Sequence, residues 1–250
     1  MTRYFLFLSF KGTAYNGWQL QPGKATVQGV VNKALTTILG ELINVTGAGR
    51  TDTGVHSSFF CCHFDSKKNE LENDQQLLYK LNGFLPGDIS LTRISKVTPE
   101  ANARFDAVSR TYCYTILKEK DPFLADTGWL LFWDLDIDKM NKAAAILLRH
   151  NDFTSFCRLH GGNKTNLCKI SEAKWTDTGK TLVFTITADR FLRNMVRAIT
   201  GTMIPVGRGK LSIADFESII EGKNRGLAGQ SAPAQGLSLT SISYPKELFI

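Results

Sequence analysis

Ten residues near the start of the chain combine glycine, arginine, a carboxylate and histidine. They read GAGRTDTGVH and occupy positions 47–56. A phosphate-binding P-loop would need a lysine followed by serine or threonine, and this stretch has no lysine. The dinucleotide-binding pattern G-x-G-x-x-G would need glycine where Asp52 stands. Neither phosphate-binding motif fits.

Asp52 is the side chain in this stretch that can do chemistry. Gly49 and Gly54 bracket it, and glycine permits a sharp turn and the close approach of a ligand. One interpretation is therefore a loop that presents a single carboxylate. The other is an Asx turn, in which the aspartate only bonds its own backbone. The pattern leaves both open.

His56, Cys61, Cys62 and His63 are metal-ligand types that lie close in sequence. The letters FFCCHF are typical of a strand, so Cys61 and Cys62 should point to opposite faces and not share one ion. The sequence offers no second cluster of ligands. We therefore predict small buried thiols and no metal.

Three arginines recur in ADRFLRNMVRAITGTM. On a helix, Arg190, Arg193 and Arg197 would share one face, with no carboxylate among them. Solvated faces usually mix charges of both signs, so this stripe favours contact with a phosphate backbone. One of the three arginines would alternatively turn inward and pair with a carboxylate.

The stretch SRTYCYTI alternates like a strand. Arg110, Tyr112 and Tyr114 should lie on one of its faces. The tyrosines then either stack on a nucleobase beside a phosphate-binding arginine or form a core-facing aromatic pair. The spacing decides for neither.

The elements that must position these residues follow a repeated order. The first half reads as strand, helix, strand, strand, helix, strand, at residues 4–10, 26–40, 43–46, 58–64, 71–81 and 89–96. The second half reads as strands at 109–119, 170–176, 181–188 and 237–244, and helices at 138–149, 190–205 and 212–222. The first order is that of a split βαβ, ferredoxin-like unit. We predict an α+β fold of two related halves, with a crossover at 97–107.

Composition narrows the class of protein. The 250 residues are 43% hydrophobic, which excludes a disordered chain, and no apolar run is long enough for a membrane span. The N-terminus lacks the features of a signal peptide. Five cysteines without a C-x-x-C pair predict reduced thiols and a cytoplasmic location. The net charge of +7 favours a polyanionic partner such as nucleic acid.

Taken in order, several blocks resemble the TruA family of tRNA pseudouridine synthases. They are YNGWQ, TVQGVVNKAL, GAGRTDTGVH, LNGFLPGDI, ARFDAVSRTYCYTI, NDFTSF, RFLRNMVRAITGTM and GLSLTSISYP. The R-T-D-x-G-V-H element is highly specific, and the collinear match spans essentially the whole chain. The resemblance implies the pseudouridine synthase fold, in which two ferredoxin-like halves join in a mixed, largely antiparallel sheet with helices packed on it. We assign the halves to residues 1–105, which carry the Asp52 loop, and 106–250.

The resemblance also implies an activity. Members are isomerases without a cofactor: the N1–C1′ bond of a uridine is cut, the uracil turns, and C5 joins C1′. The family's targets are tRNA positions 38, 39 and 40 in the anticodon stem-loop. Members are homodimers, so the expected partners are tRNA and a second copy of the chain, with no membrane and no metal.

Residue roles carry over from the matching blocks. The resemblance implies that Asp52 is the catalytic carboxylate and that Tyr112 packs on the target base. It implies that Arg197 pairs with the catalytic carboxylate, that Leu237 lines the uracil pocket, and that Arg50 handles the extruded nucleotide. Two departures concern RNA contacts. Leucine stands at position 20, where the family often has arginine, and segment 160–170 lacks the aromatic and the second arginine that some members have. Lys164 and Lys169 are the candidates to substitute for them.

The residue types agree with that chemistry. Extruding a base from a stem costs a few kcal/mol, which phosphate contacts by Arg50, Arg190 and Arg193 would offset. A carboxylate stabilises positive character at C1′, and a guanidinium partner keeps it ionised. Attack on C1′, addition to C6 and removal of the C2′ proton all remain open for Asp52.

Two other functions fit part of the sequence. A non-catalytic RNA-binding protein would explain the charge and the aromatics, but it gives no reason for Asp52 among phosphate-binding residues. An RNA glycosidase would need a second carboxylate to activate water.

Overall fold

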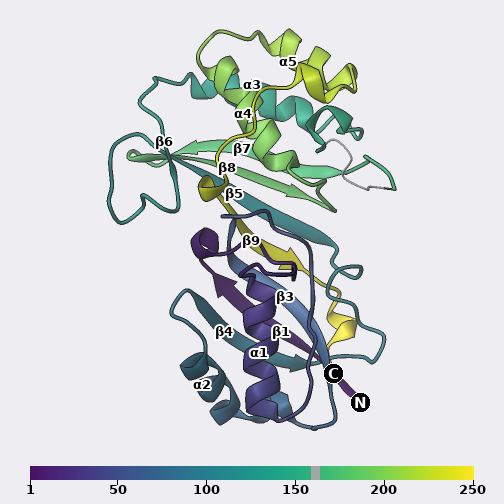
Figure 1. The fold of residues 1–250 in the computed structure, drawn as a ribbon. Helices are drawn as coiled ribbons and strands as arrows, with labels where there is room; N and C mark the ends of the chain where they lie inside the picture. Colours follow the sequence, from purple (N-terminus) through teal and green to yellow (C-terminus); the bar gives the residue numbers. More distant parts are fainter. Residues whose placement is uncertain (159–163) are drawn as a thin grey trace. The chain divides into compact units, whose positions relative to one another are not determined.

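The computed structural model describes residues 1–158 and 164–250. These residues form two compact units (Figure 1). The first unit consists of Met1–Val108 and Leu239–Ile250, and the second of Ser109–Ser238. The predicted halves, 1–105 and 106–250, stay a prediction; the units differ from them in that the last residues belong to the first unit.

The first unit contains an antiparallel sheet with two helices. Its elements are β1 (Thr2–Phe10), α1 (Val27–Leu39), β2 (Thr46–Gly47), β3 (His56–Ser66), α2 (Gln75–Phe84) and β4 (Ile89–Lys96). Strand β1 lies between β4 and β3, both antiparallel to it, and β2 pairs with β3. This is the strand order of a ferredoxin-like unit whose second strand is reduced to two residues.

Local signals explain where the two helices begin and end. The Thr26 side chain accepts a hydrogen bond from Gly29 N at the start of α1, and Gly40 ends that helix with a left-handed φ of 70°. Asp74 caps α2 by accepting a hydrogen bond from Leu77 N. The single helix predicted at residues 71–81 is therefore a short 3-10 turn followed by α2.

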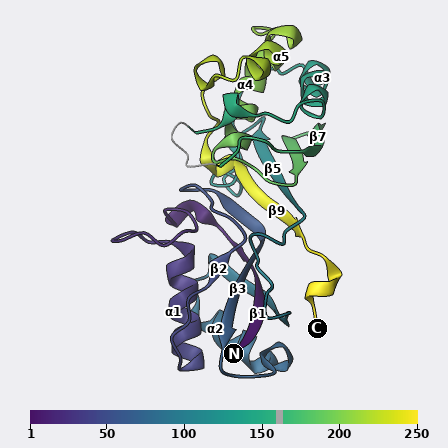
Figure 2. The same cartoon turned by 90° about the vertical axis from the view of Figure 1, so that its right-hand side faces the viewer.

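Both faces of the first unit's sheet are covered, because β1 is buried along most of its length. The rings of Phe5 and Phe7 contact Phe249, and Phe5 also meets Tyr244 at 5.0 Å between centroids. Figure 2 shows α1 on one side of this sheet and the C-terminal segment on the other. The sheet is thus a rigid base for the loops at its ends.

Apart from the two-residue strand β6 and the additional helix α5, the second unit repeats the order strand, helix, strand, strand, helix. Its elements are β5 (Ser109–Leu117), β6 (Trp129–Leu130), α3 (Ile137–Leu147), β7 (Ile170–Asp177), β8 (Thr181–Ala188), α4 (Met195–Gly207) and α5 (Ile213–Glu221). Strand β8 lies between β5 and β7 and is antiparallel to both, while β6 runs parallel to β5. The helices α3, α4 and α5 pack together on one side of these strands (Figure 1). Strand β9 (Leu237–Ser243) begins in the second unit and continues into the first.

The predicted α+β class is confirmed. The helix predicted at residues 190–205 begins too early, however, because α4 starts at Met195. Asn194 has a left-handed φ of 68°, which interrupts helical geometry directly before that residue. The strand predicted at 43–46 is also shorter than expected, since only Thr46 of that range belongs to β2.

Among the described residues, no helix combines the length and the apolar character needed to cross a bilayer. Part of segment 160–170, to which RNA contacts were assigned, lies outside the described residues.

Candidate active site

Asp52 lies in the loop that joins β2 to β3, where the sequence predicted a glycine turn. Its side chain is half-buried. The turn closes through the backbone, because Val55 N donates to the Asp52 carbonyl at 3.1 Å. Gly54 has a φ of 78°, a conformation that glycine adopts without the strain of a side chain. The turn therefore needs a glycine two residues after the carboxylate.

A second loop, residues 11–18, supports the Asp52 turn; we call it the support loop. Its Trp18 N donates to Thr51 Oγ1 at 3.0 Å, one residue before Asp52. Its Tyr15 carbonyl accepts a hydrogen bond from Gly54 N at 3.3 Å, two residues after Asp52. The chain is thus held to the support loop both before and after Asp52.

His56 provides a third anchor to the support loop. Gly12 N donates to His56 Nδ1 at 2.9 Å, and the ring is buried. Because Nδ1 accepts this bond, it carries no proton, and a neutral ring has its proton on Nε2. His56, a candidate ligand in the sequence, therefore acts here as a hydrogen-bond acceptor that fixes the loop.

Two glycines let the support loop approach this closely. A Cβ on Gly12 would lie 2.0 Å from the Val55 carbonyl oxygen. A Cβ on Gly17 would lie 2.2 Å from the Thr51 carbonyl oxygen, and Gly17 also has a φ of 79°. The backbone of the YNGWQ block thus packs directly against the Asp52 turn, a role that the sequence did not reveal.

In the second unit, the two tyrosines of β5 differ in their surroundings. Tyr114 is fully buried, and its hydroxyl donates to the Pro233 carbonyl at 2.8 Å. Tyr112 is half-buried, and its ring meets Phe191 edge to face, with 5.1 Å between centroids. The core-facing interpretation therefore applies to Tyr114, while Tyr112 is only half-buried.

Arg110 lies at the start of the same strand. Its Nη1 donates to the Asp189 carbonyl at 2.9 Å. Asp189 Oδ1 accepts in turn from Arg190 N at 2.7 Å. Arg110 and Arg190 therefore come close together at one end of β5 and β8, which the sequence did not predict.

Arg190 and Arg193 precede α4 and do not continue its face. The predicted three-arginine helical stripe is therefore wrong, since only Arg197 lies on the helix. Arg193 is exposed, and its carbonyl accepts from Arg158 N at 3.1 Å. That backbone contact ties the non-helical connection before α4 to Arg158.

Arg197 is half-buried and organises the chain that leads to Leu237. Its Nε donates to the Ala232 carbonyl at 2.8 Å, and Ala232 N donates back to the Arg197 carbonyl at 2.9 Å. A Cβ on Gly236 would lie 2.5 Å from the ring of Tyr114, so this chain passes tightly over that ring. Leu237 follows at once and is buried at the start of β9.

Residues 143–245 match the family model described as tRNA pseudouridine synthase. The tRNA pseudouridine synthase A of Bacteroides fragilis is 51% identical over 248 residues, which cover 99% of this chain and 98% of that protein. The chain belongs to the tRNA pseudouridine synthase A family. The Porphyromonas gingivalis protein of the same name is 48% identical and is covered completely, as is this chain. The Bacillus licheniformis one is 39% identical over 95% of this chain and 97% of that protein.

The predicted resemblance to the TruA family of tRNA pseudouridine synthases is thereby confirmed. The site residues themselves are not tested by these comparisons. Asp52 and Arg50 belong to the first unit, whereas Tyr112, Arg197 and Leu237 belong to the second. The pairing of Asp52 with Arg197 therefore stays a prediction.

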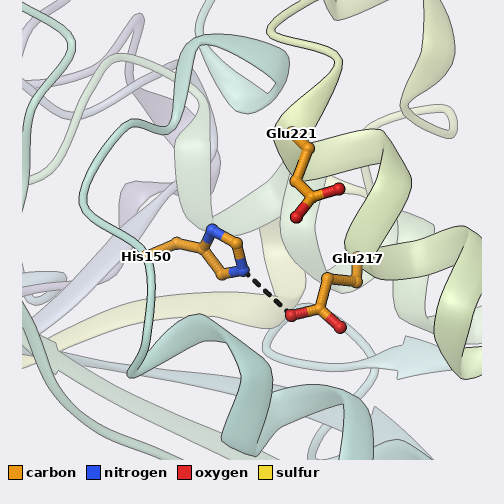
Figure 3. Close-up of side chains that lie close together, drawn as sticks. All are labelled: His150, Glu217 and Glu221. Atoms are coloured by element: carbon orange, nitrogen blue, oxygen red, sulfur yellow. Dashed lines mark hydrogen bonds and ion pairs between the residues drawn. The ribbon is translucent and has the colours of Figure 1, made fainter.

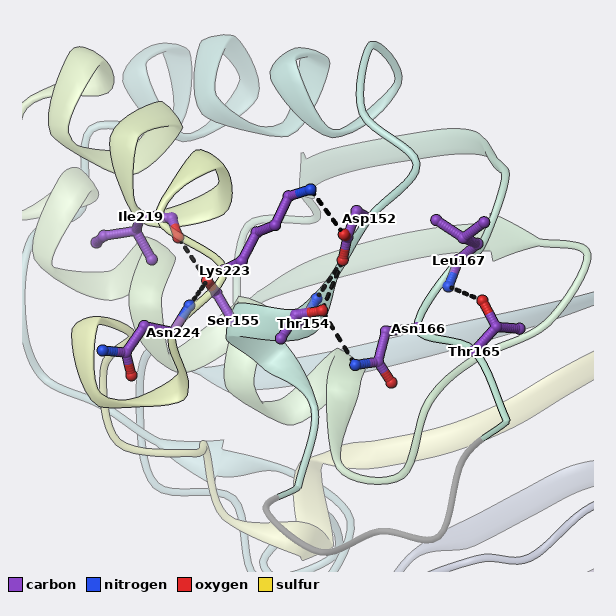
Figure 4. Close-up of polar contacts among 9 residues, drawn as sticks. All are labelled: Asp152, Thr154, Ser155, Thr165, Asn166, Leu167, Ile219, Lys223 and Asn224. Carbon is purple, nitrogen blue, oxygen red and sulfur yellow. Dashed lines mark hydrogen bonds and ion pairs between the residues drawn. The ribbon is translucent and has the colours of Figure 1, made fainter.

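One block of the family pattern, NDFTSF, had no role assigned from sequence. Figure 4 shows that it ties three connections of the second unit together. Asp152 accepts from the backbone and hydroxyl of Thr154 and lies 3.1 Å from Lys223 Nζ. Ser155 Oγ donates to the Ile219 carbonyl in α5 at 2.6 Å. Burial acts to raise the pKa of Asp152, but the hydrogen bonds from Thr154 and Lys223 hold that pKa below its usual value.

The described residues contain one group that combines several metal-ligand types. His150, Glu217 and Glu221 place one ligand atom each within 4.8 Å of the others (Figure 3). Glu217 already has protein partners, because its Oε1 lies 3.2 Å from both His150 Nε2 and Arg149 Nη2. Within this group, Glu217 is therefore ion-paired with Arg149 and lies beside His150. Cys61 and Cys62, the candidate ligands in the sequence, are free buried thiols, and burial raises the pKa of Cys61 to about 12.

Proposed function

We propose that this protein isomerises uridine to pseudouridine in tRNA, with targets in the anticodon stem-loop. Family membership supports the reaction. The observation that carries it on this chain is the Asp52 turn, which three backbone-directed hydrogen bonds hold against the support loop. A carboxylate at such a turn suits a reaction that needs one negative group at a fixed place.

Asp52 is the reacting group in this proposal. Cleaving the N1–C1′ bond develops positive character at C1′, which the ionised carboxylate stabilises. Arg197 is proposed to pair with Asp52, because a guanidinium favours the charged form of a carboxylate. Its Nε donates to the Ala232 carbonyl, which fixes where this guanidinium lies in the second unit.

The remaining roles concern the extruded nucleotide. Tyr112 is proposed to pack on the target base; it is half-buried, and its edge-to-face contact with Phe191 fixes its ring plane. Leu237 is proposed to line the uracil pocket and Arg50 to handle the extruded nucleotide. Arg110, Arg190 and Arg193 are proposed to bind phosphates, which supplies free energy for extrusion.

No cofactor is needed for this reaction. One C–N bond breaks, one C–C bond forms, and a proton moves from C5 to solvent while N1 gains one, so no electrons are transferred. We also propose that the protein acts in the cytoplasm as a homodimer, as the family resemblance implies. The uracil stays bound while it turns, which is why a single carboxylate suffices and no second one is needed to activate water.

The test compares two carboxylate-to-amide variants of the first unit. Asp52→Asn removes the charge and keeps the size, and asparagine also forms such turns. Asp74→Asn is the matched control, since asparagine caps a helix as well as aspartate does. Both should fold and bind tRNA like the unaltered protein, but only Asp52→Asn should form no pseudouridine under single-turnover conditions.

Product analysis separates the rival functions. An isomerase leaves the mass of the RNA unchanged and releases no uracil, whereas a glycosidase releases uracil. Binding without any change to the RNA by the unaltered protein would identify a non-catalytic RNA-binding protein. Turnover by Asp52→Asn at the unaltered rate would refute the role of the carboxylate.

A further inference from the structure

The side chain of Tyr15 connects the Asp52 turn to a distant part of the first unit. Its hydroxyl donates to Asp88 Oδ1 at 2.7 Å, while its backbone carbonyl accepts from Gly54 N. One residue of the support loop therefore contacts both the turn that carries Asp52 and the carboxylate of Asp88. Tyr15 is 6% exposed and Asp88 is half-buried, so this connection runs from the interior toward the surface.

Asp88 is itself fixed to the sheet. Its carbonyl accepts from Lys11 N at 2.9 Å, at the start of the support loop. The next residue, Ile89, begins β4 and pairs with Phe10 at the end of β1. Asp88 thus stands where two paired strands end, and its position follows that of the buried sheet.

We propose that Tyr15 and Asp88 are positioning residues that hold the Asp52 carboxylate in place for the isomerisation. This rests on the proposed function of Asp52. Neither residue needs to touch the tRNA: the Tyr15–Asp88 hydrogen bond fixes the Tyr15 backbone, and the Tyr15 carbonyl fixes Gly54. The LNGFLPGDI block, which contains Asp88, thereby gains a role in the site.

The hydroxyl is suited to this role because it stays a neutral donor. Burial, and then the hydrogen bond to Asp88, raise the pKa of Tyr15 above its usual value. A misplacement of a reacting group by about 1 Å can cost on the order of 100-fold in rate. A loosened turn should therefore slow the chemical step far more than it weakens tRNA binding.

The experiment removes two buried tyrosine hydroxyls in turn. Tyr15→Phe breaks the bond to Asp88, and Tyr4→Phe is the matched control, because Tyr4 is also buried in the first unit and donates to the Lys68 carbonyl. We expect Tyr15→Phe to lower the single-turnover rate by about 10- to 100-fold, with tRNA affinity within about twofold of the unaltered protein. Tyr4→Phe should keep both.

Variants of Asp88 test the same bond from its other end. Asp88→Asn retains an oxygen that accepts from the Tyr15 hydroxyl and should retain most activity, whereas Asp88→Ala should resemble Tyr15→Phe. The double variant Tyr15→Phe/Asp88→Ala should be no slower than the slower single variant, because both remove one interaction. Equal rates for Tyr15→Phe and Tyr4→Phe, whether both normal or both reduced, would overturn the proposal.

Hydrogen exchange distinguishes this proposal from the proposed function. The amide of Gly54 should exchange faster in Tyr15→Phe than in Tyr4→Phe, whatever the protein does to tRNA. Faster exchange together with an inactive unaltered protein would leave the positioning contact standing and refute pseudouridine formation. Unchanged exchange would refute the contact itself.

Discussion

Replacing Gly17 with alanine should displace the Asp52 turn by a steric clash. The new Cβ would lie 2.2 Å from the Thr51 carbonyl oxygen and 3.2 Å from the carbonyl carbon of Asp52. Relief of the first contact needs a shift of roughly 1 Å, since Cβ–oxygen contacts are normally more than 3 Å long. Thr51 is bonded directly to Asp52, so the shift should reach the carboxylate and cost on the order of 100-fold in rate.

The effect on stability has two parts that a control separates. Alanine at the left-handed φ of Gly17 costs about 1–2 kcal/mol. Overpacking against Thr51 adds about 1–3 kcal/mol. Gly23→Ala is the matched control, because Gly23 has a φ of 68° and no atom within 4 Å of the added Cβ. It should therefore show the first cost without the second and keep its activity.

Urea unfolding and single-turnover pseudouridine formation, measured on the same preparations, test this reasoning. Gly17→Ala should be less stable than Gly23→Ala by about 1–3 kcal/mol and far slower. If the two variants matched in stability and rate, the close approach of the support loop would not position Asp52.

Three further predictions concern the surface and the base. Alanine at both Arg190 and Arg193 should weaken tRNA binding for all sequences alike and reduce the log–log salt slope by about 0.7–0.9 per lost phosphate contact; an unchanged slope would mean that neither binds phosphate. Tyr112→Phe should keep its activity in a turnover assay, whereas Tyr112→Leu should not; a severe Phe defect would assign the hydroxyl to proton transfer. The hydrogen bond from Arg3 lowers the pKa of Asp65 in the folded protein. The pair therefore adds to the free energy of unfolding above the unfolded carboxyl pKa near 4, and this stabilisation is lost as the pH falls through the lowered pKa of the folded state. In urea unfolding, Arg3→Gln should therefore cost about 0.5 kcal/mol more at pH 7 than in acid, where Asp65 is protonated in the folded and unfolded states alike.

The sequence predicted elements best where independent local signals agree. Helix α1 has its Thr26 cap, its apolar face and its Gly40 end as expected, because all three depend on neighbouring residues. Strands β4 and β8 match their predicted ranges for the same reason. The turn at Asp52 was also visible, since Gly54 needs the left-handed conformation that glycine provides.

The start of α4 could not be found in this way. Apolar spacing continues upstream of Met195, and Leu192 is buried as a helix face would require. The backbone nevertheless leaves the helix, since Asn194 is left-handed and Arg193 bonds Arg158 from a remote segment. A tertiary contact overrides the local pattern here, and it separates Arg190 and Arg193 from the face of Arg197.

The support of Asp52 was hidden for a different reason. Each anchor has a backbone atom of the support loop as one partner, and backbone atoms leave no mark in the residue pattern. The partners lie 33 to 44 residues apart, from Trp18 and Thr51 to Gly12 and His56. Only the glycines that permit the approach appear in the sequence, where they read as ordinary loop residues.

A loop is an uncertain place for a reacting group, because loops move more than the strands that they connect. In this protein the Asp52 turn takes its rigidity from elsewhere: three bonds fix it to the support loop, and Tyr15 fixes that loop to Asp88 at the end of the sheet. A reaction that relies on one carboxylate has no second group to compensate for a misplaced one. The blocks YNGWQ and LNGFLPGDI therefore help to position Asp52 of the block GAGRTDTGVH. Substitutions in either should slow the chemical step more than they weaken tRNA binding.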